Sequence, residues 1–129
     1  MGLDQYAYAT TQVPDRPVDF EVSDADALIA TWRKHPDLHG WMERLYRERG
    51  GTGVETGFGD GQFNTVPVAL TLEDLDALEA AVRPRTLPHT EGFFFGASLP
   101  EDAEDDLAFI GRARKALSEG KCVYYTSWW

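Results

Sequence analysis

Residues 121–129 read Lys-Cys-Val-Tyr-Tyr-Thr-Ser-Trp-Trp, a run rich in the β-branched and aromatic side chains that are typical of strands. Residues 3–11 read Leu-Asp-Gln-Tyr-Ala-Tyr-Ala-Thr-Thr, a second strand candidate in which Tyr6 and Tyr8 project to one face. An isolated terminal strand would leave its backbone groups unpaired. We therefore expect the two runs to lie side by side in one sheet.

Two helices are predicted after the first strand. Ser23, with Asp26 three residues later, indicates a capping box at the start of the first helix. The inner stripe of this helix would consist of Leu28, Ile29 and Trp32. Pro36 interrupts it, and a second helix with apolar residues three and four apart covers 38–46.

The sequence after the second helix predicts one strand and two further helices. A glycine-rich loop at 50–61 leads to a strand at 63–70, where Pro67 indicates an edge or a bulge. Thr71 and Ser98 each begin a helix with an acidic residue three positions later. The fold class is therefore α+β, a single-domain sandwich (1–129) of a small mixed or antiparallel sheet with about four helices.

Composition restricts the partners of this chain of 129 residues. Its net charge of −10 disfavours direct binding to nucleic acid or to an anionic membrane surface. No run has the length of a membrane span, and the start lacks the features of a signal peptide, so we expect a cytoplasmic protein. The single cysteine fits a reducing compartment. No motif calls for a metal or a cofactor, and no pattern specifies an oligomeric state.

Basic and aromatic residues gather between positions 32 and 47 of this acidic chain. Rings stack on flat molecules, and Arg and Lys hold phosphate or carboxylate groups, so the cluster predicts a pocket for a small anionic or nucleotide-like ligand. With rings from the terminal strands and from the run Gly-Phe-Phe-Phe-Gly at 92–96, the candidate ligand-binding residues are Tyr6, Trp32, Arg33, Lys34, His39, Trp41, Arg47, Phe94, Tyr125 and Trp128.

Four short motifs together resemble one protein family. They are the start Met1-Gly2-Leu3-Asp4-x-Tyr6, Trp32-Arg33-Lys34 followed by His39-x-Trp41, Leu87-Pro88 before the phenylalanine run, and the closing Tyr125-x-Ser127-Trp128. This combination resembles a family of short, uncharacterised phage and prophage proteins, some of which are labelled phosphoglycerate kinase. The resemblance implies a viral or mobile-element origin, a place in the host cytoplasm, and work in counter-defence or takeover.

The kinase label does not fit the chain, because 129 residues cannot supply two domains and no phosphate-binding motif is present. The chain departs from the family pattern at His35-Pro36, which places the continuity of the helix there in doubt.

The sequence favours a binding protein over an enzyme, since no hydrolase motif is evident. Its concrete form is a counter-defence sponge that sequesters a host signalling nucleotide. One alternative is an inhibitor of a host defence protein that uses the acidic run at 101–106 to mimic nucleic acid. Another is a small enzyme with His39 as its acid–base group.

Overall fold

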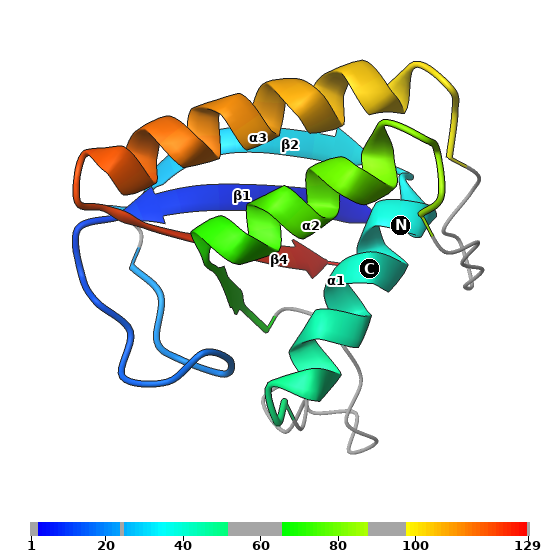
Figure 1. Ribbon diagram of the computed structural model, residues 1–129. Coiled ribbons are helices and arrows are strands. Elements are labelled where there is room, and N and C mark those ends of the chain that lie inside the picture. The colour runs from blue at the N-terminus through cyan, green and yellow to red at the C-terminus, as the bar shows by residue number, and fades with distance from the viewer. Residues whose placement is uncertain (1–2, 24, 52–65, 88–97, 129) are drawn as a thin grey trace.

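The computed structural model describes residues 3–23, 25–51, 66–87 and 98–128. These residues form a four-stranded antiparallel sheet with three helices, an α+β fold (Figure 1). The strand order across the sheet is β2-β1-β4-β3. In chain order the elements are β1 (Asp4–Thr10), β2 (Ala27–Arg33), α1 (Pro36–Glu48), β3 (Val68–Leu70), α2 (Leu72–Val82), α3 (Asp102–Ser118) and β4 (Cys122–Trp128).

The predicted pairing of the terminal strands is confirmed. β1 and β4 run antiparallel, with Asp4 opposite Trp128 and Thr10 opposite Cys122. β2 pairs with the other edge of β1, and β3 pairs with the other edge of β4. The first and last strands are therefore the two central strands of the sheet.

The helix expected between Ser23 and Pro36 is wrong, because residues 27–33 form β2. Ser23 and Asp26 do make cap-like bonds, with the Ser23 N–H donating to Asp26 Oδ2 at 3.1 Å, but these bonds close a turn and start no helix. Backbone pairing with β1, which the local spacing of apolar residues does not reveal, decides the conformation. Ala7 lies opposite Ala30 and Tyr8 lies opposite Leu28, so a β-bulge shifts the register between them.

The other helix predictions hold with one change. α1 begins at Pro36, the position before which a break was expected. Thr71 and Asp74 form the predicted capping box of α2. Ser98 does not cap α3, whose N-cap Glu101 makes no side-chain cap bond.

The third strand is shorter than predicted and lies at the sheet edge, as Pro67 indicated. It covers Val68–Leu70, and residues 63–65 of the prediction lie outside the described residues, as do 52–61 of the glycine-rich loop. Val18 forms a backbone bridge with Val68 at the edge of β3 that is not paired with β4. The segment that connects β1 to β2 therefore returns to this edge of the sheet.

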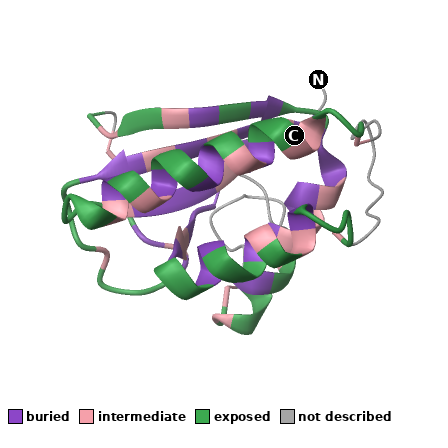
Figure 2. Ribbon diagram, turned by 45° about the horizontal axis from the view of Figure 1, so that its top comes forward, coloured by how far each residue is buried: buried purple, intermediate pink, exposed green. Residues whose placement is uncertain are grey.

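The core lies between the sheet and the three helices. α2 and α3 lie across one face of the sheet, and α1 packs at one end of it (Figure 1). Figure 2 shows the resulting division of α3, whose buried residues form an inner stripe while its other side is exposed. The largest fully buried side chains of the core include Tyr46, Tyr125, Phe109 and Met42.

Candidate functional site

Side chains alternate between the two faces of the sheet, and this alternation divides the predicted site residues. Asp4 lies opposite Arg33 of β2 and opposite Trp128 of β4, so these three side chains point to the same face of the sheet. Tyr6 lies two positions after Asp4 in β1 and therefore points to that face as well. Trp32, one position before Arg33, has the opposite parity and is buried under the helices. We call the helix-covered side the inner face and the opposite side the outer face.

The outer face carries a row of aromatic rings. The Tyr8 ring stacks on Tyr124 with a centroid distance of 5.4 Å, and it lies 6.4 Å from the ring of Tyr6. Phe20, from the segment that connects β1 to β2, meets Tyr124 edge-on at 5.4 Å. Trp128 follows at the end of β4 with 63% of its surface exposed. The rings fix one another's positions and leave the indole accessible.

A hollow of about 360 Å³ lies over these rings. Its walls come from β1, β4 and the connecting segment, and they include Tyr6, Tyr8, Val22, Tyr124, Thr126 and Trp128. This volume is at the lower end of the range for small-molecule sites, which is roughly 300–1,000 Å³. The hollow therefore has room for one small ring system.

Burial and nearby carboxylates raise the pKa of two tyrosines of the hollow, Tyr124 and Tyr6. Burial raises the pKa of Tyr124, and the carboxylate of Asp26, to which its hydroxyl donates at 2.6 Å, raises it further. Partial burial and the nearby charge of Asp4 also raise the pKa of Tyr6. At neutral pH these side chains are phenols, which offer an apolar ring and one hydroxyl each.

The predicted cations do not form one cluster. Arg33 lies on the outer face, 3.7 Å from Asp4, with 72% of its side chain exposed. Lys34 follows β2 with a positive φ of 58° and is exposed. Arg47 lies on the solvent side of α1, 5.8 Å from the centroid of the Tyr46 ring. Of the three, Arg33 is the one on the face that carries the hollow.

Three predicted residues meet on the inner face. His39 Nδ1 and the Tyr125 hydroxyl are hydrogen-bonded at 2.9 Å, and the Trp32 ring lies 6.3 Å from the Tyr125 ring. Burial lowers the pKa of His39 to about 3, so this side chain is neutral at pH 7. It is also only 2% exposed, which counts against a role as a cation or an acid–base group. Trp41 packs half-buried against the core, and Phe94 lies outside the described residues.

A buried polar cluster around His35 was not predicted. Gln5 holds the backbone of His35 with two hydrogen bonds, of 2.9 and 3.0 Å. The His35 ring lies between Ser98 Oγ, 2.6 Å from Nδ1, and Asp106 Oδ2, 2.9 Å from Nε2. The indole N–H of Trp32 donates to the other Asp106 oxygen at 2.9 Å. Two side chains therefore contact the imidazole directly, while Gln5 holds the backbone of His35 and Trp32 holds Asp106.

One sequence signal for this cluster was present. Asp106 lies three and four positions before Phe109 and Ile110, on the apolar stripe of its helix, where a carboxylate requires a buried partner. Ser98 carried no comparable signal, because its partner depends on where α3 packs. The same packing reduces the exposed acidic surface at 101–106, because Asp106 is buried and Asp102 is partly buried. The exposed carboxylates that remain are Glu101, Glu104 and Asp105.

Within the described residues, no helix is long and apolar enough to cross a membrane, and no three His, Cys, Asp or Glu side chains are grouped to hold a metal. No protein-family model, curated protein or solved structure matches the chain.

Proposed function

We propose that the outer face binds a small planar ligand of the nucleobase type and that the protein acts by holding this ligand. The observation that carries the proposal is the hollow of about 360 Å³, whose floor and walls are tyrosine and tryptophan rings. Stacking on a flat ligand requires rings that are accessible and held in place. Tyr8 and Tyr124 meet the second condition by stacking on each other, and Trp128 meets the first.

The charge around the hollow limits how many negative charges the ligand can carry. Arg33 lies on the same face as the hollow, two strands away from Trp128, and Asp4 already offsets part of its charge. This favours a nucleoside or a nucleotide with few phosphates, with the base on the rings and one anionic group toward Arg33. A host signalling nucleotide is a ligand of this class. Its sequestration by a phage-derived counter-defence protein is the biological form of the proposal, supported by the resemblance to phage proteins.

The test is a titration of the protein with adenosine, guanosine, cytidine and uridine and with their monophosphates. Binding is measured by thermal shift and by quenching of tryptophan fluorescence. A ligand that binds only the folded state raises the melting temperature. Trp128→Ala should weaken binding about 5- to 150-fold, because base–aromatic stacking contributes about 1–3 kcal/mol. Leu72→Ala is the matched control, since Leu72 is an exposed apolar residue of α2, 51% accessible.

Arg33→Ala distinguishes the two parts of the ligand. The substitution should weaken binding of the monophosphate by up to about fivefold, which is the upper range for an exposed ion pair. Binding of the nucleoside should be unchanged. Arg47→Ala, on the solvent side of α1, should affect neither. The proposal is wrong if no nucleoside or monophosphate raises the melting temperature, or if Trp128→Ala binds as tightly as the parent. Loss of a host protein partner on substitution of Glu101 and Glu104 would favour the inhibitor alternative instead.

A further inference from the structure

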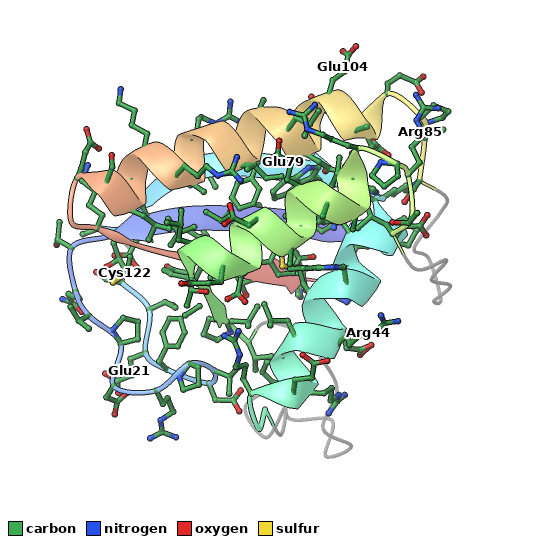
Figure 3. All side chains as sticks on the ribbon, in the orientation of Figure 1. Glu21, Arg44, Glu79, Arg85, Glu104 and Cys122 are labelled. Atoms are coloured by element: carbon green, nitrogen blue, oxygen red, sulfur yellow. The ribbon has the colours of Figure 1, made fainter. Side chains whose placement is uncertain are left out.

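A second pocket, of about 200 Å³, lies where the N-terminal ends of α1 and α3 meet the segment after α2. His35, Ser98 and Asp106 line it on one side. Apolar side chains that include Leu87 and Ala103 line the rest, together with Arg85 and Asp37. Figure 3 shows Arg85 beside the start of α3. The polar cluster around His35 is therefore reached from this pocket, through the half-buried Ser98.

The hydrogen bonds of the cluster fit the His35 tautomer that carries its proton on Nε2. Trp32 Nε1 can only donate, so Asp106 Oδ1 accepts from it. In this tautomer Asp106 Oδ2 accepts from His35 Nε2–H, which leaves Nδ1 as the lone-pair nitrogen 2.6 Å from Ser98 Oγ. The Ser98 hydroxyl then donates its proton to Nδ1, while its oxygen accepts the Asp37 N–H at 3.1 Å.

This is the order of a nucleophile, a base and an orienting carboxylate, and such an arrangement is recognised by geometry and roles rather than by sequence position. We propose that Ser98, His35 and Asp106 form a catalytic site for the hydrolysis of small esters. The Ser98 oxygen bonds to the carbonyl carbon of the ester while its proton passes to His35 Nδ1. As the ester C–O bond breaks, His35 returns this proton to the leaving alkoxide.

A water molecule completes the reaction. It gives a proton to His35 Nδ1 as its oxygen bonds to the acyl carbon, and the Ser98 oxygen leaves and takes that proton back. The acid is released and the enzyme is regenerated. During both steps Asp106 holds the positively charged imidazole. The guanidinium of Arg85, which lines the same pocket, and the positive end of the α1 dipole offset the charge that develops on the carbonyl oxygen, since the Asp37 N–H is already donated to the Ser98 oxygen.

The pocket limits the acyl group. Its volume is below the range of about 300–1,000 Å³ for drug-sized ligands, and Leu87, Leu99 and Ala103 give it an apolar lining. The substrate class is therefore a short-chain acyl ester, of acetyl to butyryl size. Asp102, whose Oδ2 lies 3.6 Å from His35 Nδ1, disfavours a negatively charged acyl group.

The test uses a fluorophosphonate probe, which bonds covalently to activated serines, together with p-nitrophenyl acetate. The folded protein should be labelled, and peptide mass spectrometry should find the adduct on Ser98. Ser98→Ala should lose the label and reduce ester hydrolysis to the rate in buffer. Ser118→Ala is the matched control, because Ser118 is exposed at the end of α3 and donates to a backbone carbonyl; it should be labelled like the parent.

Ala103→Leu tests the pocket with the three polar residues unchanged. The larger side chain should fill the apolar part and slow both labelling and acetate hydrolysis at least about tenfold, while circular dichroism stays native. The proposal is overturned if the parent is not labelled, if the adduct lies on another residue, or if Ala103→Leu reacts at the parental rate. Because the adduct is mapped in the parent protein, this result stands even if Ser98→Ala does not fold.

Discussion

The inner and outer faces are built from the same strands, yet they differ in how their polar atoms are used. On the inner face Tyr125 is fully buried and its hydroxyl is bonded to His39. One residue earlier, Tyr124 turns its ring to the outer face, where it is 2% exposed and lines the bottom of the hollow. Adjacent tyrosines are thus both buried, Tyr125 under the helices and Tyr124 against the rings of Tyr8 and Phe20.

The difference shows that residue type alone does not identify the proposed binding surface. Aromatic side chains occur on both faces, and what distinguishes them is whether a helix covers them. The inner rings contribute through burial, whereas the outer rings range from Tyr124, which is 2% exposed, to Trp128, which is 63% exposed. Substitutions on the two faces should therefore separate stability from binding.

The largest contrast is expected between the two tryptophans. Trp32→Ala removes a ring that is 5% exposed and leaves Asp106 Oδ1 without its indole donor. It should lower the free energy of unfolding by about 3–5 kcal/mol. Trp128→Ala, on the outer face, should change it by less than about 1 kcal/mol. Urea denaturation of both variants measures the contrast, and equal losses would show that the outer face is not exposed in solution.

A smaller effect is expected on the free energy of unfolding, which should depend on pH through His39 on the inner face. His39 has a pKa of about 3 when folded and an ordinary value of 6.5 when unfolded, so acid protonates the unfolded chain first. The stability that His39 contributes is complete above pH 6.5 and is lost as the pH falls toward 3. Between pH 7.5 and 4.5 the loss should be roughly 2–3 kcal/mol.

Denaturation at a series of pH values, for the parent and for His39→Gln, isolates this contribution. The glutamine variant cannot be protonated in this range, so its stability should decline less steeply between pH 6.5 and 4.5. Parallel pH profiles for the two proteins would mean that the imidazole is not buried in its neutral form.

The smallest contrast concerns two hydroxyl groups on neighbouring residues. Tyr125→Phe removes a hydroxyl from a fully buried site and leaves His39 Nδ1 without that partner, which should cost about 1–3 kcal/mol. Tyr124→Phe removes a bond to Asp26, a carboxylate that also accepts the Ser23 N–H, and should cost about 1 kcal/mol or less. Chemical denaturation of both variants in one buffer decides the ranking, and the reverse order would contradict it.

Much of the fold follows from local patterns in the sequence. The terminal strands, the capping box at Thr71 and the amphipathic stripe of α1 depend on neighbours within one element, and all three are confirmed. Residues 27–33 were predicted as a helix because Leu28, Ile29 and Trp32 also fit a helical stripe. Their strand conformation depends on pairing with β1, the preceding element, and the spacing of apolar residues within 27–33 does not reveal that pairing.

The candidate site was less accessible to sequence reasoning for the same reason. Pairing of the terminal strands brings Tyr6 and Trp128 to one face, and that part could be predicted. The separation of Arg33 from His39 could not, because it depends on β2 being a strand whose successive side chains point to opposite faces. The contact of Ser98 with His35 depends on the packing of α3 against the sheet, which no local pattern specifies.

The central position of β1 and β4 has a consequence for the rate of folding. The β1–β2 hairpin and the α2–α3 pair join segments that are close in sequence, and they can form early. The sheet is complete only when Asp4 meets Trp128, a closure that spans nearly the whole described chain. Such a loop has a high entropic cost and a correspondingly slow search. Both rows of rings in the hollow, from β1 and from β4, thus come together in one late step.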